Sequence, residues 1–119
     1  MGSDLLAVSI DCADPGRLAD FWSQALGYKV RREWEDGTQF IAKDEQTTFW
    51  VAFIRVPDAK VTKNRLHLDL RPDDQEAEVE RLIALGAARV DVGQPGDSPW
   101  VVLADPEGNE FCVLPSQQS

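Results

Sequence analysis

The sequence has no long apolar run and little positive charge. No stretch approaches the roughly 20 apolar residues that a membrane-spanning helix needs, so we expect no such helix. Twelve Lys and Arg stand against 21 Asp and Glu, which gives a net charge of −9. The densest basic cluster, Lys29, Arg31 and Arg32, is followed at once by acidic residues. Binding to nucleic acid needs clustered cations, so this distribution argues against a nucleic-acid partner.

Cysteine and histidine are also scarce. Cys12 and Cys112 are the two cysteines, and their spacing is not that of a Cys-x-x-Cys metal site. A Gly-x-Ser-x-Gly nucleophile motif, a phosphate loop and a dinucleotide fingerprint are missing. The sequence shows no basic segment followed by an apolar one at its start, so we expect no secretory signal. Reduced thiols and a cytoplasmic location are therefore expected.

The rest of the composition is that of one folded domain. The chain has 119 residues, of which 43% are hydrophobic and 28% are charged. This balance rules out a disordered chain, and the length suits a single domain over residues 1–119.

The first half has the pattern of one strand, one helix and three strands. Apolar and polar residues alternate over residues 5–12, which predicts a half-buried strand. Asp14 and Pro15 then read as N-cap and first residue of a helix that ends at Gly27. Further strands are expected over residues 28–34, 38–42 and 47–55, with an Asp36-Gly37 turn in the hairpin.

The same order of elements is expected again after a polar linker at residues 57–64. A strand over residues 66–71 precedes a helix that is capped by Asp73 or Asp74 and ends at Gly86. The apolar face of that helix is predicted to comprise Val79, Leu82, Ile83 and Leu85. Short strands are expected over residues 88–92, 100–104 and 110–114, the last two joined by a turn at residues 105–109. The predicted modules span residues 4–56 and 65–115.

The two halves form an internal repeat of about 60 residues. Leu6, Val8 and Ile10 superpose on Leu66, Leu68 and Leu70. These apolar faces are expected to pack under the helices. The opposite faces, with Ser9 and Asp11 as the mates of Asp69 and Arg71, are expected to line a shared concave surface.

His67, the sole histidine, is the main catalytic candidate. A histidine side chain suits proton transfer near neutral pH, since its pKa in unstructured peptides is about 6.5. The alternative is a purely structural hydrogen bond within the sheet. Asp69 shares its face and is expected either to orient His67 or to form an ion pair with Arg71 or Arg65.

Other polar residues of the same surface are candidates for ligand binding. Ser9, Asp11 and Arg71 either contact a ligand or form ion pairs where the modules meet. Glu110 is either an acid/base group or a solvated residue at the start of a strand. Cys112 is either a ligand contact or a small buried side chain.

Tryptophan is unusually common, with four in the chain. Trp22 is expected in the core of the first helix. Trp50 shares the parity of Ile54, and both are expected to face the cavity together with Trp100. Aromatic walls suit flat apolar ligands, whereas the alternative for Trp34, Trp50 and Trp100 is packing in the core or in an interface.

The repeat and its motifs together resemble the vicinal oxygen chelate superfamily, in its glyoxalase-like and bleomycin-resistance-like branch. The resemblance covers about residues 5–114. It is carried by Asp14-Pro15, Phe21-Trp22 and Leu26-Gly27-Tyr28 in the first half, and by residues 63–70, 82–87 and 105–111 in the second. It implies an α+β fold of tandem βαβββ modules, the glyoxalase/bleomycin resistance/dioxygenase-like fold, whose mixed sheets curl around a ligand cavity. It also implies a homodimer.

Metal-dependent relatives of this kind hold a divalent ion with four side chains, two from each module. The resemblance places those positions at Ala7, Ile54, His67 and Cys112. Only His67 belongs to the usual His/Glu set, so no metal cofactor is expected, and glyoxalase activity itself is not expected. Asp69, Asp11 or Glu110 could rebuild a site.

Three functions follow as hypotheses. The first is a metal-independent isomerase, lyase or cyclase that uses His67 as acid/base on an apolar or aromatic substrate. The second is a protein that sequesters a drug or metabolite, with the net negative charge attracting a cationic ligand. The third is a metal-dependent lyase or dioxygenase with a rebuilt site.

Overall fold

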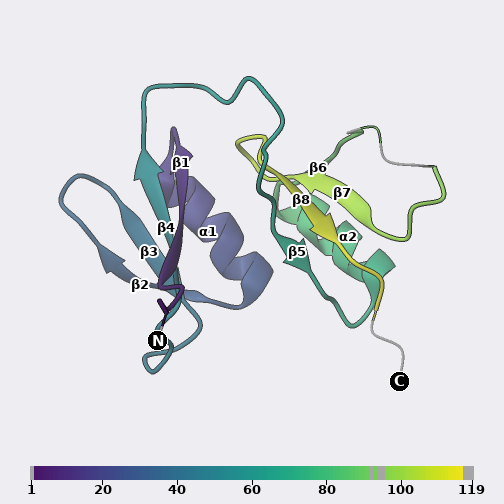
Figure 1. The fold of residues 1–119 in the computed structure, drawn as a ribbon. Coiled ribbons are helices and arrows are strands. Elements are labelled where there is room, and N and C mark those ends of the chain that lie inside the picture. Colours follow the sequence, from purple (N-terminus) through teal and green to yellow (C-terminus); the bar gives the residue numbers. More distant parts are fainter. Residues whose placement is uncertain (1, 92, 94–95, 117–119) are drawn as a thin grey trace. The chain divides into compact units, whose positions relative to one another are not determined.

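The computed structural model describes residues 2–91, 93 and 96–116. The chain divides into two compact units, Met1–Ala59 and Lys60–Ser119, and the division falls inside the predicted linker. Each unit has one helix packed on its own four-stranded sheet (Figure 1). No helix among the described residues is long and apolar enough to cross a membrane.

The first unit has the predicted order of elements. They are β1 (Ala7–Cys12), α1 (Pro15–Leu26), β2 (Lys29–Glu33), β3 (Gln39–Ala42) and β4 (Trp50–Arg55). The strand order is β1-β4-β3-β2, with β1 parallel to β4 and the other pairs antiparallel. The sheet is therefore mixed and open.

Helix α1 begins and ends where its capping residues predict. The Asp14 carboxylate accepts a hydrogen bond from the Arg17 backbone N–H, and Pro15 is the first helical residue. Gly27 ends the helix with a φ of 71°, a left-handed conformation that glycine adopts without strain. Trp22 is buried in the core as predicted and packs edge-on against Phe21, with 5.2 Å between ring centroids.

The second unit repeats this topology with shorter strands. Its elements are β5 (Asp69–Leu70), α2 (Gln75–Leu85), β6 (Ala88–Arg89), β7 (Val101–Ala104) and β8 (Glu110–Val113). The order is β5-β8-β7-β6, with β5 parallel to β8. Of the two predicted caps, Asp74 is the N-cap of α2, and its carboxylate accepts from the Ala77 N–H.

Some apolar residues are not buried as predicted. Leu6 is 63% exposed and Leu66 is 88% exposed, because each lies before the first strand of its unit begins. Ile83 is 37% exposed, since α2 buries only a narrow stripe that includes Val79 and Leu82. The prediction that Leu6 and Leu66 pack under the helices was wrong, and Ile83 lies at the exposed edge of the predicted apolar face of α2.

All the strands are somewhat shorter than predicted, and three of them are markedly shorter. The strand expected from residue 47 begins at Trp50, because the Asp44 carboxylate binds the Thr47 N–H and hydroxyl in a turn. The strand expected over residues 66–71 comprises only Asp69–Leu70, and the one expected over residues 88–92 comprises Ala88–Arg89. Val92 lies outside the described residues.

Candidate functional site

The register of the second sheet brings three side chains to one face. Asp69 on β5 is the partner of Cys112 on β8, and Cys112 is also the partner of Val102 on β7. Partners in adjacent strands point to the same side of a sheet. Asp69, Cys112 and Val102 therefore form a row across three strands.

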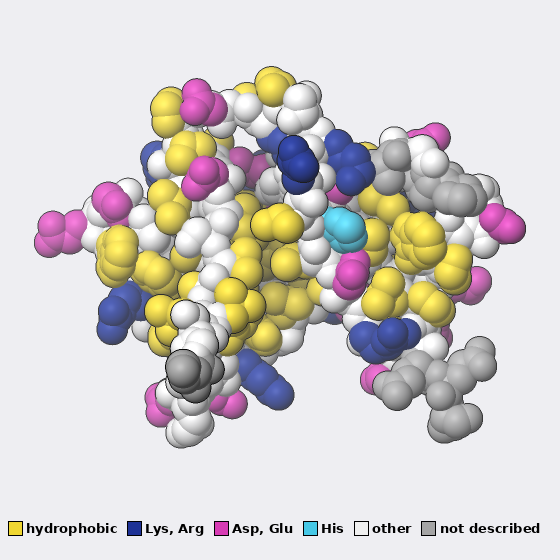
Figure 2. Space-filling model, viewed as in Figure 1, with side chains coloured by type: hydrophobic (Ala, Val, Ile, Leu, Met, Phe, Trp, Pro, Cys, Tyr) yellow, Lys and Arg dark blue, Asp and Glu magenta, His cyan; other side chains and the backbone are white. Residues whose placement is uncertain are grey.

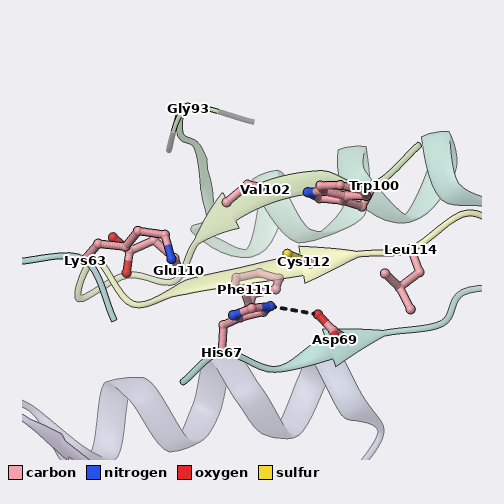
Figure 3. Close-up of a pocket in the computed structure, with 10 residues that line it drawn as sticks. All are labelled: Lys63, His67, Asp69, Gly93, Trp100, Val102, Glu110, Phe111, Cys112 and Leu114. Atoms are coloured by element: carbon pink, nitrogen blue, oxygen red, sulfur yellow. Dashed lines mark ion pairs between the residues drawn. The ribbon is translucent and has the colours of Figure 1, made fainter. Parts of the chain in front are cut away.

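A pocket of 420 Å³ lies over this row and is built from the second unit (Figure 3). Trp100, just before β7, forms part of its wall, and His67 and Asp69 line the side that belongs to β5. Among the described residues, the lining comprises Lys63, His67, Asp69, Gly93, Trp100, Val102, Glu110, Phe111, Cys112 and Leu114. Its volume suits a small organic molecule.

His67 and Asp69 interact directly at this pocket. The His67 Nε2 lies 3.3 Å from the Asp69 Oδ1, and the two side chains are 42% and 51% exposed. Figure 2 shows the imidazole at the surface with a carboxylate directly beside it. Of the three partners considered for Asp69, namely His67, Arg71 and Arg65, the structure shows His67 in contact with it. A ligand in the pocket can therefore reach both groups.

Cys112 is buried at the base of the same cluster. Burial raises the pKa of its thiol, and the negative charge of Asp69 and a hydrogen bond to that carboxylate raise it further. The donor atoms of His67, Asp69 and Cys112 all lie within 4.8 Å of one another. These three side chains are called the donor cluster below.

Glu110 has a structural role at the other end of the pocket. Its Oε1 accepts a hydrogen bond from the Asn64 N–H at 3.0 Å, and its Oε2 pairs with the Lys60 Nζ at 3.0 Å. Burial raises its pKa, but the bonds from Asn64 and Lys60 outweigh burial, so the pKa lies below the ordinary value. Its side chain is only 13% exposed, which contradicts the solvated alternative.

The remaining predicted ligand residues do not line this pocket. In the first unit, Asp11 on β1 is the partner of Ile54 on β4, and Ser9 on β1 is the partner of Ala52, so these residues share one face of the sheet. Trp50 shares this face and contacts Phe40 edge-on at 6.3 Å between centroids. In the second unit, Arg71 donates a hydrogen bond to the Pro115 carbonyl oxygen.

Sequence reasoning missed several residues of the pocket. Leu114 has the parity of Cys112, and Val102 follows from the pairing of the last hairpin, so both could have been found from the register. Phe111 and Lys63 also line the pocket. Lys63 lies in the predicted linker, where no hydrophobic periodicity indicates which way a side chain points.

The residues present do not fit the four-ligand metal arrangement that the resemblance implies. Ala7 and Ile54 carry only hydrocarbon side chains. The register pairs Ser9 with Ala52 just as it pairs Asp69 with Cys112, so Ala52 is the counterpart of Cys112 in the first unit. Ala52 offers no donor either, and the first unit therefore supplies no side-chain ligand at the implied positions.

Comparisons with known proteins agree with this architecture. A glyoxalase/bleomycin resistance/dioxygenase family enzyme from Burkholderia phytofirmans PsJN is similar, with a TM-score of 0.71, 20% identity and coverage of 93% of this chain and 97% of that one. A mutant of the fosfomycin resistance protein FosX from Listeria monocytogenes, solved with Mn(II) and 1S,2S-dihydroxypropylphosphonic acid, has a TM-score of 0.74 at 15% identity and covers 98% and 93%.

An antibiotic binding protein, TnmS3 from Streptomyces sp. CB03234, is similar at a TM-score of 0.64 and 20% identity, with 97% of each chain covered. A search of curated protein sequences finds no match. The sequence profile of the glyoxalase-like domain matches residues 7–114. With its repeated βαβββ units and this match over most of its length, the chain belongs to the glyoxalase-like domain family of the vicinal oxygen chelate superfamily.

Proposed function

We propose that the protein binds a small apolar or aromatic molecule in the pocket of the second unit and moves a proton on it. The reaction class is that of an isomerase, lyase or cyclase that needs no metal. The observation that carries this proposal is the His67 Nε2–Asp69 Oδ1 contact of 3.3 Å at a pocket with a tryptophan wall.

The proposed roles follow from the chemistry of the two side chains. With its Nε2–H directed to the Asp69 carboxylate, the imidazole keeps a lone pair on Nδ1, which takes a proton from an acidic C–H or O–H group. Asp69 holds the ring in place and stabilises the imidazolium that forms. Trp100 offers an aromatic surface for a flat ligand.

Hydrogen–deuterium exchange tests the proton transfer without knowledge of the natural substrate. The probes are 2-indanone and 2-tetralone, which are flat, apolar and carry acidic C–H groups. In buffered D₂O, proton NMR follows the loss of their α-hydrogen signals. We expect exchange at least about tenfold above buffer, since general acid–base catalysis contributes about 10²–10⁴-fold.

Matched variants separate the roles. His67→Gln is expected to return the exchange rate to that of buffer, and Asp69→Asn to lower it at least about tenfold. Glu80→Gln removes an exposed carboxylate of α2 outside the pocket and is expected to change nothing. Exchange that is equal in the wild type and His67→Gln, or no faster than buffer with both probes, would contradict the proposal.

Sequestration of a drug or metabolite is the second candidate. It is supported by the apolar part of the pocket, with Trp100, Val102 and Leu114, and by the similarity to an antibiotic binding protein. This function predicts stoichiometric binding that weakens with salt and leaves the ligand unchanged, which calorimetry and mass spectrometry of the recovered ligand can measure.

Assembly and location are part of the same proposal. We propose a homodimer, as the family implies. Leu5 and Leu6, which precede β1, are exposed, and their exposure supports the dimer because a second protomer would bury these apolar side chains. Light scattering after gel filtration tests it, and a monomer at high concentration would contradict it. We also propose a cytoplasmic location, which is supported by the lack of a disulfide between Cys12 and Cys112 in the structure.

A further inference from the structure

We propose that the donor cluster His67, Asp69 and Cys112 binds a thiophilic divalent ion such as Zn²⁺, and that the ion switches the pocket off. This site differs from the four-ligand arrangement of the superfamily. It lies within the second unit alone, and it includes Asp69, which is not one of the implied positions.

The distances suit a tetrahedral ion after small side-chain rotations. Ligands at 2.0–2.3 Å from Zn²⁺ lie about 3.5 Å from one another. The His67 nitrogen and the Asp69 oxygen are already 3.3 Å apart, and all three donor atoms fall within 4.8 Å. The fourth position would face the pocket and take water.

The charges also suit a divalent cation. The Asp69 carboxylate and the Cys112 thiolate together balance the two positive charges of the ion, and the thiol proton passes to the buffer when the ion binds. Glu110, which also lines the pocket, does not compete, because its oxygens are held by Lys60 and Asn64. Lys63 also lines the pocket, and its positive charge opposes the binding of a cation.

The donor types select the ion. One nitrogen, one oxygen and one sulfur suit Zn²⁺ and Co²⁺. Mg²⁺ and Ca²⁺ take six or more oxygen ligands and are excluded by this set. The ion that suits these donors is therefore a borderline-soft one.

The regulatory part of this inference rests on the proposed function. An ion bound at Nε2 displaces the proton of that atom, and the ring proton of the neutral imidazole moves to Nδ1. The Nδ1 lone pair that the proposed proton transfer uses is then no longer available, and the ion also takes the Asp69 carboxylate away from the ring. Binding of the ion and acid/base use of His67 therefore exclude each other. Zn²⁺ is expected to abolish the deuterium exchange of 2-indanone, and a chelator is expected to restore it.

Co²⁺ titration tests the site itself through its spectrum. We expect one equivalent of Co²⁺ to give a near-ultraviolet thiolate charge-transfer band and visible bands of tetrahedral intensity. Cys112→Ser should abolish the thiolate band, and Asp69→Ala should weaken binding at least about tenfold. Cys12→Ser is the matched control, because Cys12 lies in the first unit, and it should leave the spectrum unchanged.

The outcomes separate the two proposals. No thiolate band, or a band that survives in Cys112→Ser, would overturn the metal site whatever the enzyme does. A normal band together with unchanged exchange in His67→Gln would overturn the proposed function and leave the metal site standing. Exchange that depends on His67 and resists saturating Zn²⁺ would overturn the switch.

Discussion

The Lys60 ammonium lies 3.0 Å from the Glu110 Oε2 and ties the first residue of the second unit to strand β8. The same carboxylate accepts the Asn64 N–H, so one side chain holds two points of the segment that precedes His67. This carboxylate thereby helps to place Lys63 and His67 at the pocket.

Glu110→Gln is expected to lower the free energy of unfolding by about 1–2 kcal/mol at pH 7, because the neutral amide loses hydrogen bonds of the charged group. The pKa of Glu110 is lowered in the folded state, so its stabilisation is complete above the ordinary glutamate pKa of about 4.3. It is lost as the pH falls through the lowered value. In urea unfolding, the difference in the free energy of unfolding between wild type and variant should therefore shrink below about pH 4. A difference that does not change with pH would contradict the stabilising role of the Glu110 carboxylate.

Asp105→Ala is expected to destabilise the protein by about 3 kcal/mol, because it leaves donors of a buried turn without an acceptor. The Asp105 carboxylate accepts from the N–H groups of Glu107 and Asn109 and from the Asn109 side chain. Thermal unfolding measures the effect, with the exposed Asp97→Ala as the control. A loss no larger than that of the control would refute the role of this turn.

Two glycines of the first unit should respond in opposite ways to alanine. Gly27→Ala is expected to cost about 1 kcal/mol, because its φ of 71° is disfavoured for a residue with a Cβ. Gly16→Ala should be neutral or stabilise by up to about 1 kcal/mol, since Gly16 is helical and a Cβ there meets Gln39 Nε2 at 3.4 Å. Chemical denaturation measures both, and stabilisation by Gly27→Ala would be inconsistent with the capping argument.

Trp100→Ala is expected to weaken binding of the flat probe 2-naphthol about tenfold, through loss of an aromatic wall of the pocket. Calorimetry measures the affinity directly. Trp34→Ala is the matched control, because Trp34 lies in the first unit and packs on Phe40 at 4.8 Å between centroids. Equal losses in the two variants would show that the probe does not select the Trp100 pocket.

Local signals predicted most of the elements. Asp14, Pro15 and Gly27 mark the ends of α1, and Asp74 and Gly86 mark the ends of α2, because capping depends on hydrogen bonds and dihedral angles within a few residues. The repeated order of elements was also predicted. The exposure of Leu6 and Leu66 was not, since alternation in the sequence continues beyond the point where a strand finds a partner.

The candidate site was predicted only in part. His67, Asp69, Trp100, Glu110 and Cys112 were expected at a cavity, and the structure places all of them at one pocket. Their roles there depend on contacts that alternation does not reveal. The pairing of Glu110 with Lys60 joins residues 50 positions apart, and Lys63 enters the pocket from a segment without periodicity.

The sequence by itself determined the two βαβββ units, the helix ends and the family, because these follow from local hydrogen bonding, periodicity and a repeated pattern. Only the tertiary structure decided that Asp69 faces Cys112 across parallel strands and that His67 contacts Asp69. Strand register is set by packing between segments that are distant in the chain. The donor cluster is a product of that register, which no local pattern encodes.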